Sequence, residues 1–458
     1  MEKGQVAAMV ATPHTARRST RRPAIALVIT AGLIAGACAS DDDDSDDVAA
    51  TVPAPADDAD SDDADGGEED AGSDDPDGGE ADAPVETPTA NLTDGCVESV
   101  VEGVDYFPEK VELEYASNFS VSYHDTYKIL TIDEPFPAGE AESYVLVQCG
   151  ADAPAEVDAP APVAATIDVP IGGLLSSSTT HLPFIEQLDR IDDLVGVSSL
   201  GFVSSQAVLD RSGDLIEYAS EGALDTEVAL TAGADALMTG GTDDEGHQVL
   251  RDAGLPVVAN AEWLEPTPLG RAEWIKYMSV LFNEEAAATA QFESVEADYD
   301  AVVALAAGVA DGERPSVMTG VDFDGTYFAA GGDSYVASLI ADAGGAYVWS
   351  DNTETGSLSI DLEAQLERGG DAEIWINGST FWTSLDGMVE EEPRYGEFAA
   401  QQSGQVWVYN RIQNENGGVD YFERGVTRPD LVLADLLKIF HPELAEDHAF
   451  EWYQQVPA

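Results

Sequence analysis

The amino-acid sequence predicts an α/β protein in which two similar lobes with parallel-rich sheets are joined by one long backbone helix and preceded by a small β-rich extension. Three observations support this fold class. Residues 224–236 and 360–372 repeat one pattern, strands alternate with helices from residue 165 onward, and a long helical pattern lies between the two halves. Two such lobes would leave a cleft between them.

The repeat predicts the same helix in each lobe. In both copies an aspartate can cap a helix that carries a glutamate in its first turn, then an apolar face, then a glycine that ends the helix. An apolar strand follows, at 236–238 in the first copy and at 374–376 in the second. The copies are too far apart to be units of a solenoid, so they indicate two lobes of similar structure. The matched positions are Asp225/Asp361, Glu227/Glu363, Leu230/Leu366, Gly233/Gly369, Asp235/Asp371 and Ala236/Ala372.

The N-terminus is typical of an exported lipoprotein. Four arginines between residues 17 and 22 precede an apolar core, 24–37, that is short for a membrane span. The core ends in Ala-Gly-Ala-Cys at 35–38, so we expect a signal peptide over 1–38 and a lipid on Cys38. An ordinary secretory signal with an incidental cysteine is the alternative.

Residues 39–90 are predicted to be a disordered acidic linker. The segment is rich in Asp, Glu, Ala, Gly and Pro and contains neither Lys nor Arg, so it cannot bury enough apolar surface to fold. Charge repulsion would extend it into a stalk that keeps the body near the outer face of the cell membrane. The formal net charge of −70 argues against nucleic acid or anionic lipid as a partner.

The three cysteines fit the same location. With Cys38 lipidated, Cys96 and Cys149 remain and can form a disulfide in an oxidising exterior; two free thiols are the alternative.

The remaining sequence divides into four parts. Strand-like runs at 111–115, 119–123 and 143–147 indicate the β-rich extension. The helical pattern from Leu269 to Gly308 predicts one stiff spine that permits only small hinge motions. The expected parts are 91–164 (extension), 165–268 (N-terminal lobe), 269–311 (backbone helix) and 312–458 (C-terminal lobe).

Four segments resemble the periplasmic binding proteins for ferric siderophores and vitamin B12, the class with a single rigid backbone helix. They are 178–197, 262–276, 331–345 and 420–435, and together they span nearly the whole folded body. The resemblance implies a monomer that captures a small-molecule iron chelate between its lobes. It also implies delivery of that chelate to an ABC permease and its ATPase.

The resemblance further implies one glutamate on the rim of each lobe that pairs with arginines of the permease. It places these permease-docking residues at Glu227 and Glu363, the pair that the repeat aligns. The structural alternative is that each glutamate only complements its helix dipole, an effect of up to about 1 kcal/mol.

Ligand-binding candidates lie on loops that follow strand ends, where α/β sheets bind ligands. Hydroxyls and backbone N–H groups at a strand-to-helix turn can meet an anion, aromatic rings can stack on a planar chelate, and an arginine can pair with an anionic one. The same residues can instead be a helix cap, core aromatics and, for Arg428 with Asp430, a structural ion pair. The ligand-binding candidates are Thr179, Thr180, His181, Trp263, Arg271, Tyr327, Phe328, Thr380, Phe381 and Trp382, with Arg424 and Arg428 as further cations.

The sequence indicates neither a metal site nor an enzyme. The six histidines are scattered without the spacing of metal ligands, although His181 with Tyr327 could hold haem. A nucleophile elbow, a phosphate loop and a paired acid and base in context are all lacking. We therefore expect no resident cofactor and rank a ferric siderophore first as ligand, with haem and cobalamin as alternatives. A secreted cell-wall hydrolase and a permease-independent sensor or adhesion module remain as competing functions.

Overall fold

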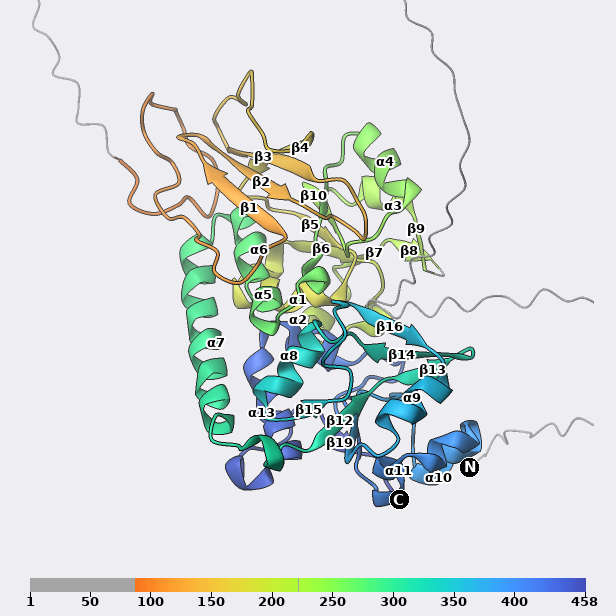
Figure 1. Ribbon diagram of the computed structural model, residues 1–458. Helices are drawn as coiled ribbons and strands as arrows, with labels where there is room; N and C mark the ends of the chain where they lie inside the picture. Colours follow the sequence, from red (N-terminus) through yellow and green to blue (C-terminus); the bar gives the residue numbers. More distant parts are fainter. Residues whose placement is uncertain (1–86, 221) are drawn as a thin grey trace, which may run out of the picture.

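Three larger sheets organise residues 87–220 and 222–458, the part of the chain that the computed structural model describes (Figure 1). One sheet has four strands and the other two have five strands each. The expected signal peptide, the lipidation site Cys38 and nearly all of the acidic linker lie outside the described residues. The mixed α/β architecture with parallel-rich sheets confirms the predicted fold class.

The extension is built on the four-stranded sheet. Its strands β1 (Phe119–Tyr123), β2 (Tyr127–Ile132) and β3 (Glu142–Gln148) are antiparallel, and β4 (Val163–Val169) runs parallel to β3. A disulfide joins Cys96 to Cys149, the pair for which the sequence predicts one.

The strand predicted at 111–115 is wrong, because its backbone bonds to a side chain instead of a neighbouring strand. The N–H groups of Glu114, Tyr115 and Ala116 all donate to the carboxylate of Glu273. That carboxylate is fully buried and also accepts from Lys276 Nζ at 2.7 Å.

The first lobe has a fully parallel sheet in the order β11-β10-β5-β6-β7. Short helices connect its strands, and the small hairpin β8 (Ala219–Ser220) and β9 (Ala223–Leu224) precedes α3. The bounds are β5 (Leu174–Ser176), α1 (Leu182–Gln187), β6 (Leu194–Val197), α2 (Gln206–Asp210), β7 (Ile216–Glu217), α3 (Thr226–Thr231), β10 (Ala236–Thr239), α4 (Glu245–Asp252) and β11 (Val257–Ala259).

The second lobe has the order β15-β12-β17-β18-β19, parallel except for the antiparallel edge strand β19. A small antiparallel sheet, β13-β14-β16, follows β12. The bounds are β12 (Ser316–Thr319), β13 (Val321–Phe323), β14 (Thr326–Ala330), α8 (Tyr335–Asp342), β15 (Ala346–Tyr347), β16 (Ser357–Ile360), α9 (Leu362–Gly369), β17 (Ile374–Ile376), α10 (Leu385–Glu391), α11 (Ala399–Ser403), β18 (Val406–Val408), α12 (Arg424–Thr427), α13 (Pro429–Phe440) and β19 (Gln454–Gln455).

The two lobes share one strand order. The order β6-β5-β10-β11 in the first lobe matches β15-β12-β17-β18 in the second, and β7 extends the first sheet at one edge. Among the four matched strands of each lobe, the first along the chain lies between the second and the third. The repeated segments supply the helix and strand at equivalent places, α3 with β10 and α9 with β17. Sheets of this order bind ligands outside the carboxyl ends of the strands at the point where the strand order reverses, which here lies between β5 and β10 and between β12 and β17.

The repeated helices begin as predicted but end differently. Asp225 caps α3 by accepting from Val228 N at 3.1 Å, and Asp361 caps α9 by accepting from Ala364 N at 2.7 Å. Gly233 follows α3 with φ +73°, a left-handed conformation that favours glycine. Gly369 is the last residue of α9, so the second copy also ends at its glycine, but the next residue, Gly370, keeps a right-handed helical conformation.

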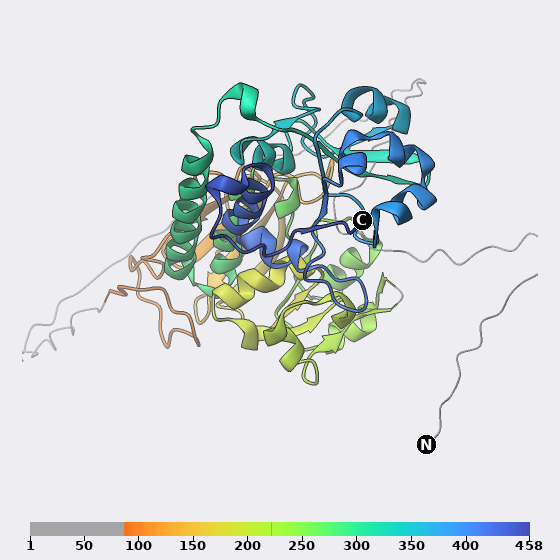
Figure 2. The same cartoon turned by 90° about the horizontal axis from the view of Figure 1, so that it is seen from below.

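The single backbone helix predicted between the lobes is three helices. They are α5 (Pro268–Ala272), α6 (Trp274–Phe282) and α7 (Glu285–Ala306), and Asn283 interrupts the last two with φ +59°. Only α7 joins the lobes; at 22 residues it spans roughly 33 Å. It runs along one flank of the molecule, where α13 packs against it, and the lobes lie beside it (Figures 1 and 2).

The break arises because the extension covers α6. All nine residues of α6 are buried, with β4 and α1 packed against the helix. Buried charges at the start of α7 then fix its direction: Lys128 Nζ donates to Asn283 Oδ1, Glu285 Oε1 and Val280 O, each at 2.7 Å. A pattern that looks like one amphipathic helix is therefore a buried helix followed by a surface helix.

Candidate ligand-binding site

The turn after β5 in the first lobe is held mainly by its own side chains. Ser178 caps the short 3-10 helix Thr179–His181, and its Oγ lies 2.9 Å from Thr180 Oγ1. His181 is fully buried with Nδ1 2.9 Å from Ser176 Oγ, and burial lowers its pKa to about 3. Of the three candidates on this turn, only Thr179 is half-buried; Thr180 and His181 belong to the core.

Trp263 is fixed at the end of β10. Its indole N–H donates to Gly240 O at 3.1 Å, and the ring is half-buried. Gly241, with φ +69°, lies so close that a Cβ there would meet Trp263 Nε1 at 2.6 Å. The lack of a side chain at Gly241 thus lets the Trp263 ring approach the end of β10 closely.

Arg271 lies where the two lobes meet. It is 7% exposed, its guanidinium lies 4.4 Å from the ring centre of Tyr335 on α8, and one of its terminal nitrogens bonds Glu262 at 3.1 Å. Its Nε has no partner among the described residues. A cavity of about 20 Å³ between Arg271, Tyr335 and Tyr421 has room for about one water molecule.

Three further tyrosines continue from Arg271 into the second lobe. The ring of Tyr421 stacks on Tyr409 with centres 4.5 Å apart and lies 5.9 Å from Tyr453. Tyr453 Oη donates to Asn377 Oδ1 at 2.5 Å, immediately after β17. Burial raises the pKa of Tyr421 and Tyr453 well above the ordinary value, so both phenols are neutral.

These contacts connect the two strand ends at which sheets of this order bind ligands. Asn377 bonds Tyr453, whose ring contacts Tyr421. Tyr421 and Arg271 line the same small cavity, and Arg271 bonds Glu262. Glu262 precedes Trp263, which contacts the end of β10. Tyr335, Tyr409, Tyr421 and Tyr453 were not among the sequence candidates, although Tyr335 and Tyr421 lie in segments that carry the resemblance.

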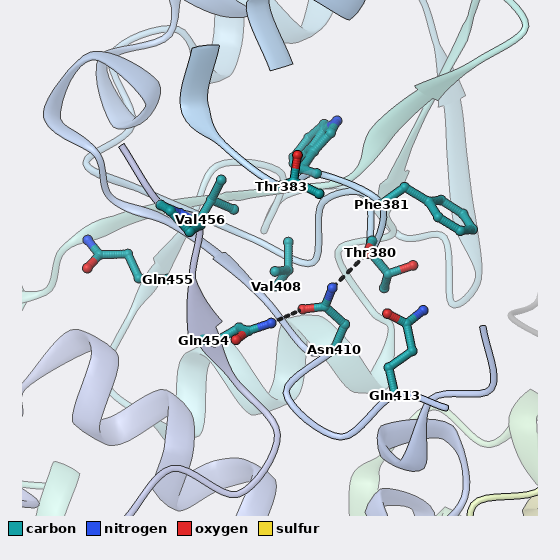
Figure 3. A pocket seen from close by; sticks show the side chains of 11 residues that line it. Thr380, Phe381, Thr383, Val408, Asn410, Gln413, Gln454, Gln455 and Val456 are labelled. Carbon is teal, nitrogen blue, oxygen red and sulfur yellow. Dashed lines mark hydrogen bonds between the residues drawn. The ribbon is translucent and has the colours of Figure 1, made fainter. Parts of the chain in front are cut away.

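The second lobe contains a hollow of about 420 Å³ beside the end of β17. Thr380, Phe381 and Trp382 line it, so the structure brings these three candidates together. The loop after β18 and the C-terminal strand β19 complete the lining (Figure 3). The other lining residues are Thr383, Val408, Asn410, Gln413, Gln454, Gln455, Val456 and Pro457.

A chain of amide hydrogen bonds shapes this hollow. Asn410 Nδ2 donates to Thr380 O at 2.6 Å, and Gln454 Nε2 donates to Asn410 Oδ1 at 2.7 Å (Figure 3). Phe381 is 66% exposed, whereas Trp382 is buried with its indole N–H donating to Glu391. The hollow therefore offers an aromatic face and oriented amides.

Tyr327 and Phe328 line neither cavity. They lie on β14, whose antiparallel sheet turns the chain away from the end of β12. Tyr327 is fully buried and donates to Thr319 O at 2.9 Å, which leaves no ring surface for a ligand. His181 and Tyr327 occupy separate lobes as core residues, so the haem-holding pair has no basis in this arrangement.

The other cationic candidates are ion-paired. Arg424 bonds Asp420 at 2.6 Å and Glu451 at 2.8 Å. Arg428 bonds Asp430 at 2.6 Å, which confirms the structural ion pair.

Both glutamates considered for docking are exposed, and their helices α3 and α9 lie on the side of the molecule away from α7 (Figure 1). Glu363 contacts Arg394 at 2.9 Å, while Arg394 also bonds Glu392 and holds the pKa of that carboxyl at about 2. Among the described residues Glu227 has no ion pair.

In residues 87–220 and 222–458, no group of three or more His, Cys, Asp or Glu side chains is placed to hold a metal. Nor is any helix in these ranges long and apolar enough to cross a membrane.

Residues 236–411 match the family described as periplasmic binding protein. Two curated proteins of Methanocaldococcus jannaschii, both named uncharacterized lipoproteins, are similar to the chain. One is 27% identical over 60% of this chain and 67% of its own length, and the other is 26% identical over 47% and 54%. The chain thus spans about half to two thirds of these relatives.

Among solved structures, a periplasmic haem-binding protein from Pseudomonas aeruginosa is 17% identical, with a TM-score of 0.47 over 59% of this chain and 93% of that one.

Proposed function

Since residues 236–411 belong to the periplasmic binding protein family, we propose that the chain is a lipid-anchored, extracytoplasmic solute-binding protein of an ABC importer. It captures a ferric siderophore, or a related iron or corrin chelate, between its lobes and hands it to the permease. The lipoprotein names of the two M. jannaschii relatives support the anchor at Cys38.

The observation that carries this proposal is the contact path between the ligand-binding ends of the two sheets. Arg271 and Trp263 come from the first half, and Tyr335, Tyr421 and Asn377 come from the second. A ligand that touches both ends of this path would hold the lobes together. This arrangement favours capture over catalysis, because the path presents rings, amides and one paired guanidinium. The Ser176 hydroxyl does lie beside His181, but both side chains are buried in the core and burial lowers the pKa of His181.

The hollow beside β17 is the wider part of the proposed site. Phe381 offers the most exposed ring there, and a planar or bulky chelate can pack against it. The buried ring of Trp382 supports the same loop and provides an optical probe close to a bound ligand.

Fluorescence titration of the purified full chain tests the proposal. Ferric chelates, cobalamin and haem are added in turn, and we expect at least one to quench tryptophan emission saturably. Phe381→Ala should weaken binding of that ligand by about 1–2 kcal/mol, roughly tenfold, because its exposed ring is lost from the site.

Phe323→Ala is the matched control, since Phe323 is 58% exposed in the same lobe and lies outside the hollow. If none of the chelates quenches tryptophan emission saturably, the proposal is contradicted. Turnover of an offered glycan or ester by the purified chain would favour the cell-wall hydrolase instead.

A further inference from the structure

The hollow beside β17 contains no charge. None of its eleven lining residues is ionisable at neutral pH; they are hydroxyl, amide, aromatic and aliphatic side chains. The chain around it carries 89 Asp and Glu residues against 19 Lys and Arg. A neutral surface hollow in so acidic a chain limits the kind of ligand that it can hold.

Several polar groups of the hollow are left for a ligand. Asn410 is already held by Thr380 O and Gln454. Among the described residues, the hydroxyls of Thr380 and Thr383 have no hydrogen-bond partner, and Gln413 has only a 3.5 Å contact from its Nε2 to Gly417 O. Hydroxyls and amides both donate and accept, so they complement carbonyl, amide and hydroxyl groups.

No cation is among the residues that line the hollow. Arg271 is paired with Glu262, and Arg424 is paired with two carboxylates. Arg411 follows Asn410 in the chain and is exposed, but it is not among the residues that line the hollow. An anion enclosed by the lining residues would therefore find no cation among them, and its desolvation would go uncompensated there.

We propose that the hollow receives the uncharged, carbonyl- and amide-bearing groups of the ligand, and hence that the cargo is an electrically neutral or weakly cationic chelate. Three hydroxamates balance the charge of Fe³⁺, and the amide side chains of a corrin are uncharged; both offer the required chemistry. Three catecholates around Fe³⁺ leave three negative charges, and haem carries two carboxylates. The assignment rests on the proposed function, because it names the ligand class of the same site.

The test uses the purified full chain and four probes at one ionic strength. They are a ferric trihydroxamate, cobalamin, a ferric tris-catecholate and haem, each followed by tryptophan quenching. We expect one of the first two to bind at least about tenfold more tightly than either anionic probe. Comparison of the trihydroxamate and cobalamin titrations then shows which of these two ligands supplies the uncharged carbonyl and amide groups.

Three variants locate the effect. Gln413→Leu should lower affinity for the neutral probe roughly tenfold, because a ligand group loses its amide partner. Gln402→Leu, at an exposed glutamine of α11 outside the hollow, should leave it unchanged. Arg411→Gln should also leave it unchanged, whereas it would weaken binding of an anion held by that arginine. Circular dichroism checks that each variant is folded.

The outcomes separate the two proposals. Tighter binding of the tris-catecholate or haem, or unchanged affinity in Gln413→Leu, overturns the neutral-ligand assignment and leaves the binding function standing. Saturable binding of none of the four probes overturns both.

Discussion

Lys128 is a buried charge that fastens the extension to the start of α7. Its side chain has no exposed surface, its ammonium donates to Glu285, Asn283 and a backbone carbonyl, and it lies 4.7 Å from the ring centre of Phe107. Burial lowers the pKa of Lys128, and the carboxylate of Glu285 opposes that shift. Such a pair is costly to break because the remaining charge stays buried without its partner.

Lys128→Met should therefore lower the free energy of unfolding by about 3–5 kcal/mol. The double change Lys128→Met with Glu285→Gln should recover part of that loss, since no uncompensated charge remains. Urea denaturation of the full chain measures both. Lys110→Met, which removes an exposed pair with Asp105, is the control and should cost less than about 1 kcal/mol. An equal loss in the free energy of unfolding in Lys128→Met and Lys110→Met would contradict the role of Lys128 as a buried ion-pair partner.

The candidate site shows how far single residues could be predicted. Strand-end reasoning grouped Thr380, Phe381 and Trp382 as candidates, because the loop after a buried parallel strand must emerge at that edge, and the three line one hollow. It failed for Tyr327, because a hairpin after β12 buries the ring. The tyrosines around Arg271 come from segments far apart in the sequence, and only tertiary packing brings them together.

At the scale of elements, helix starts were predictable and helix interruptions were not. Asp225 and Asp361 form local caps that depend on a few neighbouring residues. The break at Asn283 depends on the extension packing over α6, a contact between distant parts of the chain. Local sequence patterns therefore identify helical segments, whereas the point at which a segment breaks into two helices depends on the elements that pack over it.

Glu423, between the short helix at 420–422 and α12, connects the second lobe to the first. Its buried carboxylate accepts from the backbone N–H groups of Ser204 and Ser205 at 2.7 and 2.8 Å, next to the start of α2. Burial raises the pKa of Glu423 to about 7, with the carboxylates of Asp420 and Glu186 adding to the shift and the two N–H donors opposing it.

The free energy of unfolding should fall as pH rises, because deprotonation of Glu423 leaves a charge buried away from water. The pKa of Glu423 in the folded state exceeds the ordinary value of 4.5, so its contribution to stability is complete below pH 4.5 and is lost as pH rises through about 7. Between these values the free energy of unfolding should fall more steeply with pH in the native chain than in Glu423→Gln. Urea denaturation at several pH values compares the slopes, and parallel curves would contradict the prediction.

For the whole molecule, the internal repeat indicated two lobes of one topology, and the shared strand order confirms it. The position of one lobe relative to the other could not be predicted, because it depends on α7 and on cross-lobe contacts such as Arg271 with Tyr335. The extension also proved to be attached to the body by hydrogen bonds to Glu273 and by the Lys128–Glu285 ion pair, contacts that its sequence does not reveal.

The exposure of Glu227 and Glu363 leads to a prediction about delivery of the chelate to the permease. If they dock the chain on arginines of the permease, reversing both to arginine should lower uptake of a radio-iron-labelled chelate more than about tenfold, while ligand affinity stays unchanged. Breaking the exposed contact of Glu363 with Arg394 should cost little stability. Glu367→Arg, on the exposed face of the same helix, is the control. Normal uptake in the double variant would contradict docking and favour a permease-independent sensor.

Hydrogen exchange of the full chain with and without its chelate tests most directly whether the lobes enclose a ligand. We predict slower exchange on binding in the segments 377–383, 408–413 and 260–264, which come from both lobes, and no change in the middle of α7. Slowing confined to one lobe or to the extension, with these segments unaffected, would contradict capture between the lobes.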